Sequence, residues 1–342
     1  MTKIFGVLLR LVLGTILFAG SQSVVFAAPA VSKHILYINS YHKGYPWSDD
    51  LMNGMDAGFA RSGLDIEMYT RFMDMKRLSG DDYYVEKLKE EYKAGFRKEH
   101  FDLILVSDND AFDFIRKYRQ ELFPGVGVVF SGINDFEDSM MVGQENMTGV
   151  VEDTDYEDTI RLAQKLFPKV RTIVIVTDET TTGRAHWLEI QKILPHFGGH
   201  LDFRKLSLGD FTLDGLVKRL AALQDDSAVL LLSHFKDKDG RAYSMKQSVR
   251  AISQRAAVPC FVVNSSRLGY GPLGGKVTSG YYQGEAMSDM AVRILHGTDI
   301  RSIPILRISP NKYMFDSYVL RHFHVPENAL PANSIVMNTS RT

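Results

Sequence analysis

The stretch FDLILVSDND, residues 101–110, decides the fold of this chain because it joins a buried strand to a polar strand end. Its central residues, Leu103–Val106, are apolar without alternation. An alternating strand has one face in water, whereas an unbroken apolar run is typical of a strand buried on both faces of a parallel sheet. Similar runs recur as IVIV at 173–176, VLLL at 229–232 and FVV at 261–263. The sequence therefore predicts parallel sheets with helices on both faces.

Strands and amphipathic helical segments alternate along the chain, which is the pattern of a doubly wound α/β fold. The helical spacing is clear at Leu51, Met55 and Phe59, and again at Leu162 and Leu166. The predicted strands are His34–Ser40, Asp65–Phe72, Phe101–Ser107, Gly127–Ser131, Thr172–Thr177, His200–Leu206, Ala228–Ser233 and Pro259–Asn264. The series occurs twice, so we predict two doubly wound parallel-sheet lobes.

The lobe boundary is predicted near Val150, after an irregular polar segment. Residues 31–150 would form the N-terminal lobe and residues 151–276 the C-terminal lobe. After Gly275 we expect a short strand (VTSGYY, 277–282), a helix and a third short strand at Ile303–Ile308. These segments are expected to cross between the lobes, so that about 280–302 returns to the first lobe and about 308–342 to the second.

The first residues have the order of a secretory signal. Lys3 supplies positive charge, the run Leu11–Ala19 is largely apolar, and compact residues stand at Val25–Ala27. We expect removal of residues 1–27, with cleavage after Ala30 as the alternative, and a periplasmic location. A retained membrane anchor is the other interpretation, but a spanning helix needs roughly 20 apolar residues and this run is much shorter.

Composition excludes several classes of protein. A net charge of −1 with 24% charged residues creates no attraction to nucleic acid. The only cysteine, Cys260, lies in an apolar run, so we expect a buried thiol, no internal disulfide and no lipid anchor at the N-terminus.

Polar and aromatic side chains follow the predicted strands, where parallel sheets bind their ligands. The loop after the first strand has Tyr41, Tyr45 and Trp47, which is more aromatic surface than a turn needs. Short polar groups orient a small ligand and rings cover it. The predicted ligand-binding residues are Ser40, Tyr41, Tyr45, Trp47, Asp108, Asn109, Ser131, Asn134, Asp178, Thr182, His234, Asn264 and Ser265.

An ordinary structural role is the alternative for each of these positions, because Ser, Thr, Asp and Asn are also the common turn and helix-cap residues. Ser48 is predicted to cap the helix after the first strand. Thr181–Gly183 is expected to begin a helix whose N–H groups suit an anion such as a carboxylate.

Enzyme motifs are absent from the sequence: it has no GxSxG, no GxGxxG after the first strand and no Walker A sequence. Asp108 and Asp110 are the residues that a metal-dependent hydrolase would use, but no second acidic cluster or nucleophile accompanies them. We therefore expect a non-enzyme without a metal or other cofactor, and keep the hydrolase as an alternative.

Several segments together resemble a known family. They are Ile38–Asp50 (INSYHKGYPWSDD), Val106–Asp110, Val129–Asn134, Asn146–Val150, Thr278–Leu295, Asn311–Asp316 and Leu330–Ile335. Their order is similar to that of periplasmic substrate-binding proteins of ATP-binding-cassette transporters, in the branch that also forms sensor domains of hybrid histidine kinases. The resemblance implies a type I periplasmic-binding-protein fold, in which a three-strand hinge joins the lobes and ligand is enclosed by hinge closure.

The expected function is therefore capture of a small molecule, carboxylate-bearing or aromatic, for delivery to a membrane permease. Transporter-type relatives are associated with aromatic amino acids, but the loops of this sequence differ, so that specificity is not transferred. The alternative is a sensory subunit that docks on a separate membrane histidine kinase or diguanylate cyclase. We expect a monomer that does not bind nucleic acid.

Overall fold

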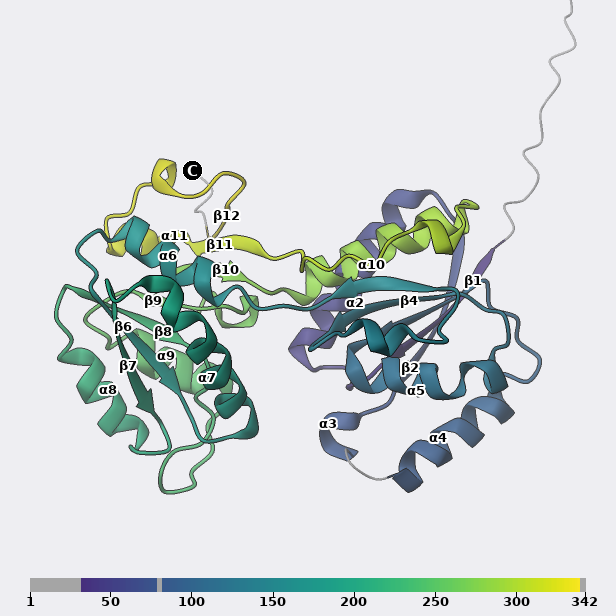
Figure 1. Ribbon diagram of the computed structural model, residues 1–342, viewed down its shortest axis with the longest axis horizontal. Helices are drawn as coiled ribbons and strands as arrows, with labels where there is room; N and C mark the ends of the chain where they lie inside the picture. The colour runs from purple at the N-terminus through teal and green to yellow at the C-terminus, as the bar shows by residue number, and fades with distance from the viewer. Residues whose placement is uncertain (1–31, 79–81, 339–342) are drawn as a thin grey trace, which may run out of the picture. The chain divides into compact units, whose positions relative to one another are not determined.

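Two sheets organise the computed structural model, which describes residues 32–78 and 82–338 (Figure 1). The predicted export signal, residues 1–27, lies outside the described residues. No helix in the described part of the chain is long and apolar enough to cross a membrane.

The first sheet has five parallel strands in the order β2-β1-β3-β4-β5. Its strands are β1 (Lys33–Asn39), β2 (Ile66–Phe72), β3 (Leu103–Ser107), β4 (Val128–Ile133) and β5 (Met147–Val151). The helices of this lobe are α2 (Pro46–Ser62), α3 (Met75–Leu78), α4 (Asp82–Gly95), α5 (Asp108–Leu122) and α10 (Gly280–Leu295), with 3-10 turns η1 (Asp138–Met141) and η4 (Ile300–Ser302).

The second sheet has seven strands in the order β12-β11-β10-β9-β8-β6-β7. Its strands are β6 (Thr172–Thr177), β7 (Asp202–Ser207), β8 (Ser227–Leu231), β9 (Cys260–Phe261), β10 (Gly274–Val277), β11 (Lys312–Asp316) and β12 (Ile335–Met337). The helices are α6 (Tyr156–Leu166), α7 (Thr181–Ile193), α8 (Leu213–Ala221), α9 (Met245–Ser253) and α11 (Ser317–His322), with 3-10 turns η2 (Leu194–Phe197), η3 (Ser265–Arg267) and η5 (Glu327–Ala329). The β10–β11 pair is antiparallel, and the other pairs are parallel.

Each sheet is buried on both faces, which explains the apolar runs of its strands. In β1, Ile35 and Tyr37 pack with side chains of α2 and α10, whereas Leu36 and Ile38 face the helices α4 and α5. Successive residues of β6 divide in the same way between a core with α6 and a core with α8 and α9. The predicted fold, two parallel-sheet α/β lobes, is confirmed.

Three chain segments connect the lobes. The first runs from β5 to α6, the second from β10 to α10, and the third from η4 to β11. Two isolated parallel bridges, Val150 with Leu306 and Asn264 with Thr278, add backbone contacts beside these segments. Because β5 and β10 both leave their sheets at their carboxyl ends, the connections lie at the carboxyl edge of each sheet.

Three sequence predictions of local structure are wrong. VTSGYY is not one strand, because β10 ends at Val277 and both tyrosines belong to α10. Ile303–Ile308 forms no strand, since only Leu306 makes an isolated bridge. Ser48 does not cap α2: the helix begins earlier, at Pro46, whose fixed φ suits a first turn. The Ser48 hydroxyl instead donates to Asn39 Oδ1 at 3.0 Å.

Helices α2 and α10 lie side by side in the first lobe (Figure 1), and glycines allow the close approach. A Cβ atom on Gly54 would lie 1.9 Å from the carbonyl oxygen of Tyr281, and one on Gly284 would lie 1.9 Å from that of Leu51. No side chain fits at such distances, so the backbones themselves form this contact. It attaches the returning segment of the chain to the first lobe.

We expect Gly284→Ala to lower the free energy of unfolding by about 1–3 kcal/mol, because the new methyl group must push the α2 backbone away. The loss would appear despite the roughly 1 kcal/mol by which Ala favours a helix over Gly. Urea denaturation followed by circular dichroism measures it. Gly95→Ala in α4 is the matched control, since no atom lies within 4 Å of its added Cβ. Equal stability of Gly284→Ala and the wild type would contradict the close contact.

Candidate functional site

The carboxyl edges of the two sheets carry the predicted binding residues, and the lobe connections leave from the same edges. Parallel strands place their ends together, so residues distant in sequence become neighbours there. The polar side chains at these edges divide into those that are buried and hold loops, and those that remain partly exposed.

Ser40 belongs to the buried group in the first lobe. It is fully buried, its hydroxyl donates to the carbonyl of Ser107 at 2.7 Å, and it accepts from the N–H of Ala111 at 2.8 Å. These bonds attach the end of β1 to the start of α5. Ser40 therefore positions the loop rather than presenting its hydroxyl to a ligand.

The aromatic loop, as we call residues 41–47, joins β1 to the first two residues of α2 and is partly exposed. The rings of Tyr41 and Tyr45 meet edge to face, with centroids 5.1 Å apart. Trp47 Nε1 donates to Asp108 Oδ1 at 2.8 Å, which joins this loop to the start of α5. Burial, together with the charges of Asp108 and Glu152, raises the pKa of Tyr41, so its phenol stays protonated.

Asp108 is the first residue of α5 and has a φ of 67°, in the left-handed region that non-glycine residues seldom adopt. It is 2% exposed. Strain of this kind is retained where the surroundings enforce it, and it is common at binding sites. Here it aims the carboxylate at the indole of Trp47, across the end of the sheet.

Asn109 and Asn134 form a reciprocal pair between α5 and the end of β4. The N–H of Asn134 donates to Asn109 Oδ1, and Asn109 Nδ2 donates to the carbonyl of Asn134, both at 3.0 Å. Asn134 Nδ2 also donates to Glu152. Ser131 lies inside β4, fully buried, and donates to Gln283 Oε1 at 3.1 Å. Of these three predicted residues, only Ser131 is enclosed.

Asp178 has a structural role at the end of β6. Its carboxylate accepts from the hydroxyls of Thr180 and Ser233 and from the backbone N–H of Phe235, at 2.5, 2.8 and 2.7 Å. Burial would raise its pKa, but these hydrogen bonds outweigh burial and lower it. Asp178 is 1% exposed. It fixes the loops after β6 and β8.

The helix start predicted at Thr181–Gly183 is confirmed, with Thr180 as the residue that caps it. The Thr180 side chain accepts from the N–H of Gly183 at 3.1 Å. The predicted residue Thr182 is exposed in the first turn of α7. A free hydroxyl beside a helix start is suited to an anionic or polar ligand group.

His234, the predicted residue after β8, is fully buried. Its Nδ1 lies 2.7 Å from the Ser248 hydroxyl, and its Nε2 lies 3.4 Å from Arg267 Nε, which donates to it. Burial and the charge of Arg267 lower the pKa of His234 to about 3, so the ring is neutral. Its function in this arrangement is to hold the Arg267 guanidinium.

Asn264 and Ser265 follow β9, where Asn264 caps the 3-10 turn η3. Its Oδ1 accepts from the N–H and the hydroxyl of Ser266, and its Nδ2 approaches Thr278 in the second lobe connection. Ser265 is partly exposed.

Sequence reasoning missed four residues at these edges: Gln283, Tyr156, His186 and Arg267. Tyr156 begins α6, and its hydroxyl lies 2.6 Å from His186 Nδ1 on α7. Arg267 stands two residues after the predicted Ser265, but nothing in the sequence marks it as buried. Because an arginine in a loop is exposed in most proteins, the sequence around Arg267 did not indicate a binding residue.

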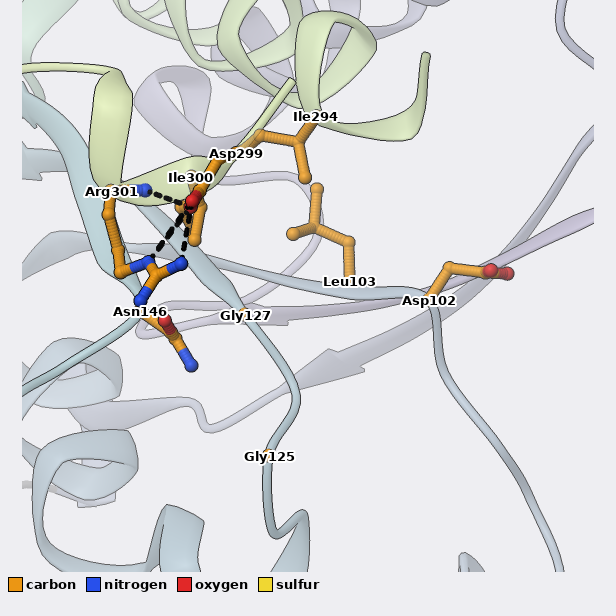
Figure 2. A pocket seen from close by; sticks show the side chains of 9 residues that line it. All are labelled: Asp102, Leu103, Gly125, Gly127, Asn146, Ile294, Asp299, Ile300 and Arg301. Carbon is orange, nitrogen blue, oxygen red and sulfur yellow. Dashed lines mark hydrogen bonds and ion pairs between the residues drawn. The ribbon is translucent and has the colours of Figure 1, made fainter. Parts of the chain in front are cut away.

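A cavity of about 370 Å³ lies at the opposite, amino edge of the first sheet, where it is lined by residues that precede β3, β4 and β5 (Figure 2). Its charged groups already have partners: Asp299 pairs with Arg301 at 2.7 Å, and Asp102 with Lys33 at 3.5 Å. We therefore place the candidate site at the carboxyl edges and not in this cavity. Within residues 32–78 and 82–338, no three His, Cys, Asp or Glu side chains gather into a metal site.

Comparison with known families identifies one match. A sequence model described as ABC transporter substrate binding protein matches residues 126–328, which is more than half of the chain. No curated protein sequence matches the chain.

Solved structures of low sequence identity share the fold. An ABC domain from Streptococcus pneumonia in complex with L-Trp has 15% identity and a TM-score of 0.56, over 89% of this chain and 100% of the other. CD0873, an open ligand-free substrate binding protein from Clostridium difficile, has 14% identity and a TM-score of 0.61, over 90% and 99%. A periplasmic ribose ABC transporter protein from Conexibacter woesei has 16% identity and a TM-score of 0.53, over 86% and 96%.

Acid should destabilise the fold through the buried His234 and the partly buried His186. Burial, with the charge of Arg267, lowers the pKa of His186 to about 4 and that of His234 to about 3, whereas an unfolded histidine titrates near 6.5. Between pH 6.5 and 4 the unfolded chain binds more protons, so the free energy of unfolding falls with falling pH. The fall is at most about 1.4 kcal/mol per pH unit for each histidine.

Urea denaturation of the wild type and His186→Gln between pH 7.5 and 4.5 tests this expectation. Below pH 6.5, the free energy of unfolding of the variant should fall less steeply with falling pH than that of the wild type, by about one proton bound on unfolding. Carboxyl groups contribute equally to both proteins, so they do not affect the difference. The exposed His200, changed to Gln, controls for the substitution itself. Identical slopes in the wild type and His186→Gln would show that His186 titrates alike in the folded and unfolded states.

Proposed function

We propose that this chain, which belongs to the ABC transporter substrate-binding protein family, binds a small molecule at the carboxyl edges of its two sheets and delivers it to an ATP-binding-cassette permease. The observation that carries the proposal is the position of the three lobe connections. All of them join the lobes beside the edges where polar and aromatic side chains remain partly exposed. A ligand held there contacts both lobes and the connections between them.

In this proposal, the two lobes close around the bound ligand. Ligand stabilises the closed state only to the extent that it makes contacts there that the open state lacks. In this proposal, residues 31–150 with about 280–302 move as one body, and residues 151–276 with about 308–342 as the other. The close α2–α10 contact supports the first body, and the pairing of β11 with β10 supports the second.

The ligand contacts come from the partly exposed members of the predicted set. In the first lobe these are Tyr41, Tyr45, Trp47, Asn109 and Asn134, and in the second Thr182, Asn264 and Ser265. The buried members of the set do not contact the ligand, but hold the loops that carry the exposed ones. They are Ser40, Asp108, Ser131, Asp178 and His234. This division favours binding over catalysis, since the enclosed acids and histidine are already engaged by the protein.

The identity of the ligand does not follow from the similar structures. One of them is described with L-Trp and another as a ribose transporter protein, and both share no more than 16% identity with this chain. The aromatic loop suits a ligand with a flat apolar face, on which Tyr41 and Tyr45 can pack.

Export to the periplasm, with removal of the first 27 residues, belongs to the same proposal, because a permease receives its ligand outside the cytoplasm. The sensory alternative has no separate structural support. The tail segments that resemble the sensor branch contain β11 and lead into β12, so they serve the second sheet whichever partner the protein has.

Trp47 offers a direct test, because the chain has only two tryptophans. In a Trp187→Phe variant, fluorescence reports Trp47 alone. We expect small molecules released from the purified protein by methanol, and identified by mass spectrometry, to shift this emission and raise the melting temperature when returned to ligand-free protein. Tyr45→Ala should weaken their binding about tenfold through lost ring contact.

Tyr318→Ala is the matched control, since Tyr318 is 58% exposed on α11 and outside the site. A purified protein that releases no small molecule, and whose melting temperature rises with nothing in a cell extract or metabolite panel, would contradict the binding function. Normal import of the identified ligand in a deletion strain would contradict delivery to a permease as its role.

A further inference from the structure

We propose that Arg267 is the anion anchor of this site and that the ligand carries a carboxylate group. The inference rests on the proposed binding function and adds the chemical class of the ligand. It starts from one side chain at the carboxyl end of β9, in the 3-10 turn η3.

Arg267 is a buried cation that makes no ion pair with the part of the chain that the structure describes. It is 8% exposed, and no carboxylate of the described residues lies within salt-bridge distance of its guanidinium. Burying an unpaired charge is unfavourable, and proteins avoid it unless the charge meets a partner. Burial lowers the pKa of Arg267 to about 10, which still leaves it charged at neutral pH.

The guanidinium is held in a fixed direction by two neutral acceptors. Its Nη2 donates to the carbonyl of Leu232 at 2.7 Å, and its Nε donates to His234 Nε2 at 3.4 Å. His234 is itself oriented by the hydroxyl of Ser248. Among the described residues, nothing accepts a hydrogen bond from Nη1 of Arg267. This nitrogen is therefore the part of the guanidinium that remains to bind a ligand.

Three ionisable groups of its own lobe on which the charge of Arg267 acts are neutral as well. Its charge acts on Tyr156, His186 and His234, and none of them is an anion at pH 7. The nearby carboxylate of Asp178 is engaged by Thr180, Ser233 and Phe235. A buried cation whose hydrogen-bond partners are neutral attracts an anion strongly, because little water is present to screen it.

A second buried arginine has both of its Nη groups engaged, and only its Nε lacks a hydrogen-bond partner among the described residues. Arg119 is 3% exposed, and its two Nη groups donate to the carbonyls of Val126, Glu145 and Asn146. It stands at the end of α5, away from the carboxyl edge of its sheet. Arg119 therefore has a structural role, and the contrast assigns the ligand to Arg267.

The location agrees with this assignment. Arg267 follows Asn264, which forms a backbone bridge to Thr278 in the second lobe connection. In the first lobe, burial and the carboxylates of Asp108, Asp110 and Glu152 raise the pKa of Tyr41, so the buried cation of Arg267 has its counterpart in acids on the other edge. A single guanidinium balances one negative charge. A carboxylate therefore fits better than a phosphate dianion, which would need further cations.

Matched acids and amides test the proposal. The probes are L-phenylalanine and L-phenylalaninamide, phenylacetate and phenylacetamide, succinate and succinamide, together with phosphate and a phosphate monoester. They are added to ligand-free full-length protein, with melting temperature and calorimetry as readouts. We expect at least one acid to bind and its amide to bind at least about thirtyfold more weakly, as for loss of one partner from a buried charge pair.

Arg267→Gln should weaken binding of that acid by a similar factor, and Arg267→Lys by less, because a charge remains without the planar fork. Arg119→Gln is the control: it removes a buried guanidinium elsewhere and should leave the affinity within twofold. Circular dichroism checks the fold of each variant. If Arg267→Gln does not fold, the comparison of acid and amide binding to the wild type still tests whether the site requires a carboxylate.

The outcomes separate the two proposals. Equal binding of acid and amide, wild-type affinity in folded Arg267→Gln, or binding of the phosphate monoester in place of any carboxylate would overturn the carboxylate anchor and leave the binding function intact. Absence of binding to every probe and to a cell extract would overturn both.

Discussion

The side-chain amide of Gln283 is the interaction on which the carboxyl edge of the first sheet depends. Its Oε1 accepts from the Ser131 hydroxyl and the N–H of Gly132, and its Nε2 donates to the carbonyl of Val151 and to the Ser309 hydroxyl. It thereby joins the start of α10, just after the second lobe connection, to the first and third connections and to β4. Gln283 is 1% exposed, so removal would leave several buried polar groups unpaired. Gln283 therefore fixes the three lobe connections against the carboxyl end of β4.

The same principle, a buried polar group that holds a loop, recurs at the other strand ends. Ser40 links β1 to α5, and Asp178 links the loops after β6 and β8. Such groups hold the strand-end loops in a fixed geometry, and these loops carry the partly exposed side chains that the proposal assigns to the ligand. The cost of ordering these loops is met during folding and not during binding, which favours affinity.

The sequence was sufficient for the fold because the apolar runs at 103–106 and 173–176 report burial on both faces, a property of each strand alone. The sequence was insufficient where tertiary contacts determine the bounds of a strand or helix. The extent of β10 depends on its antiparallel partner β11, and no local pattern contains that partner. Ser48 is a plausible cap by residue type, but Pro46 begins the helix and Asn39 takes the hydroxyl. Arg267 and Gln283 matter through their burial, which composition does not reveal.

The two edges differ in charge, and this asymmetry sets what a closing site can select. Acids act on Tyr41 in the first lobe, whereas the second lobe contributes a buried guanidinium whose hydrogen-bond partners are neutral. A ligand with one anionic end has a preferred orientation in such a field, before any short-range contact forms. Closure then adds the contacts of Tyr41 and Tyr45 to a ligand that is already oriented. Discrimination against uncharged analogues follows from the same arrangement, because they leave the buried cation of Arg267 without an anion to balance its charge.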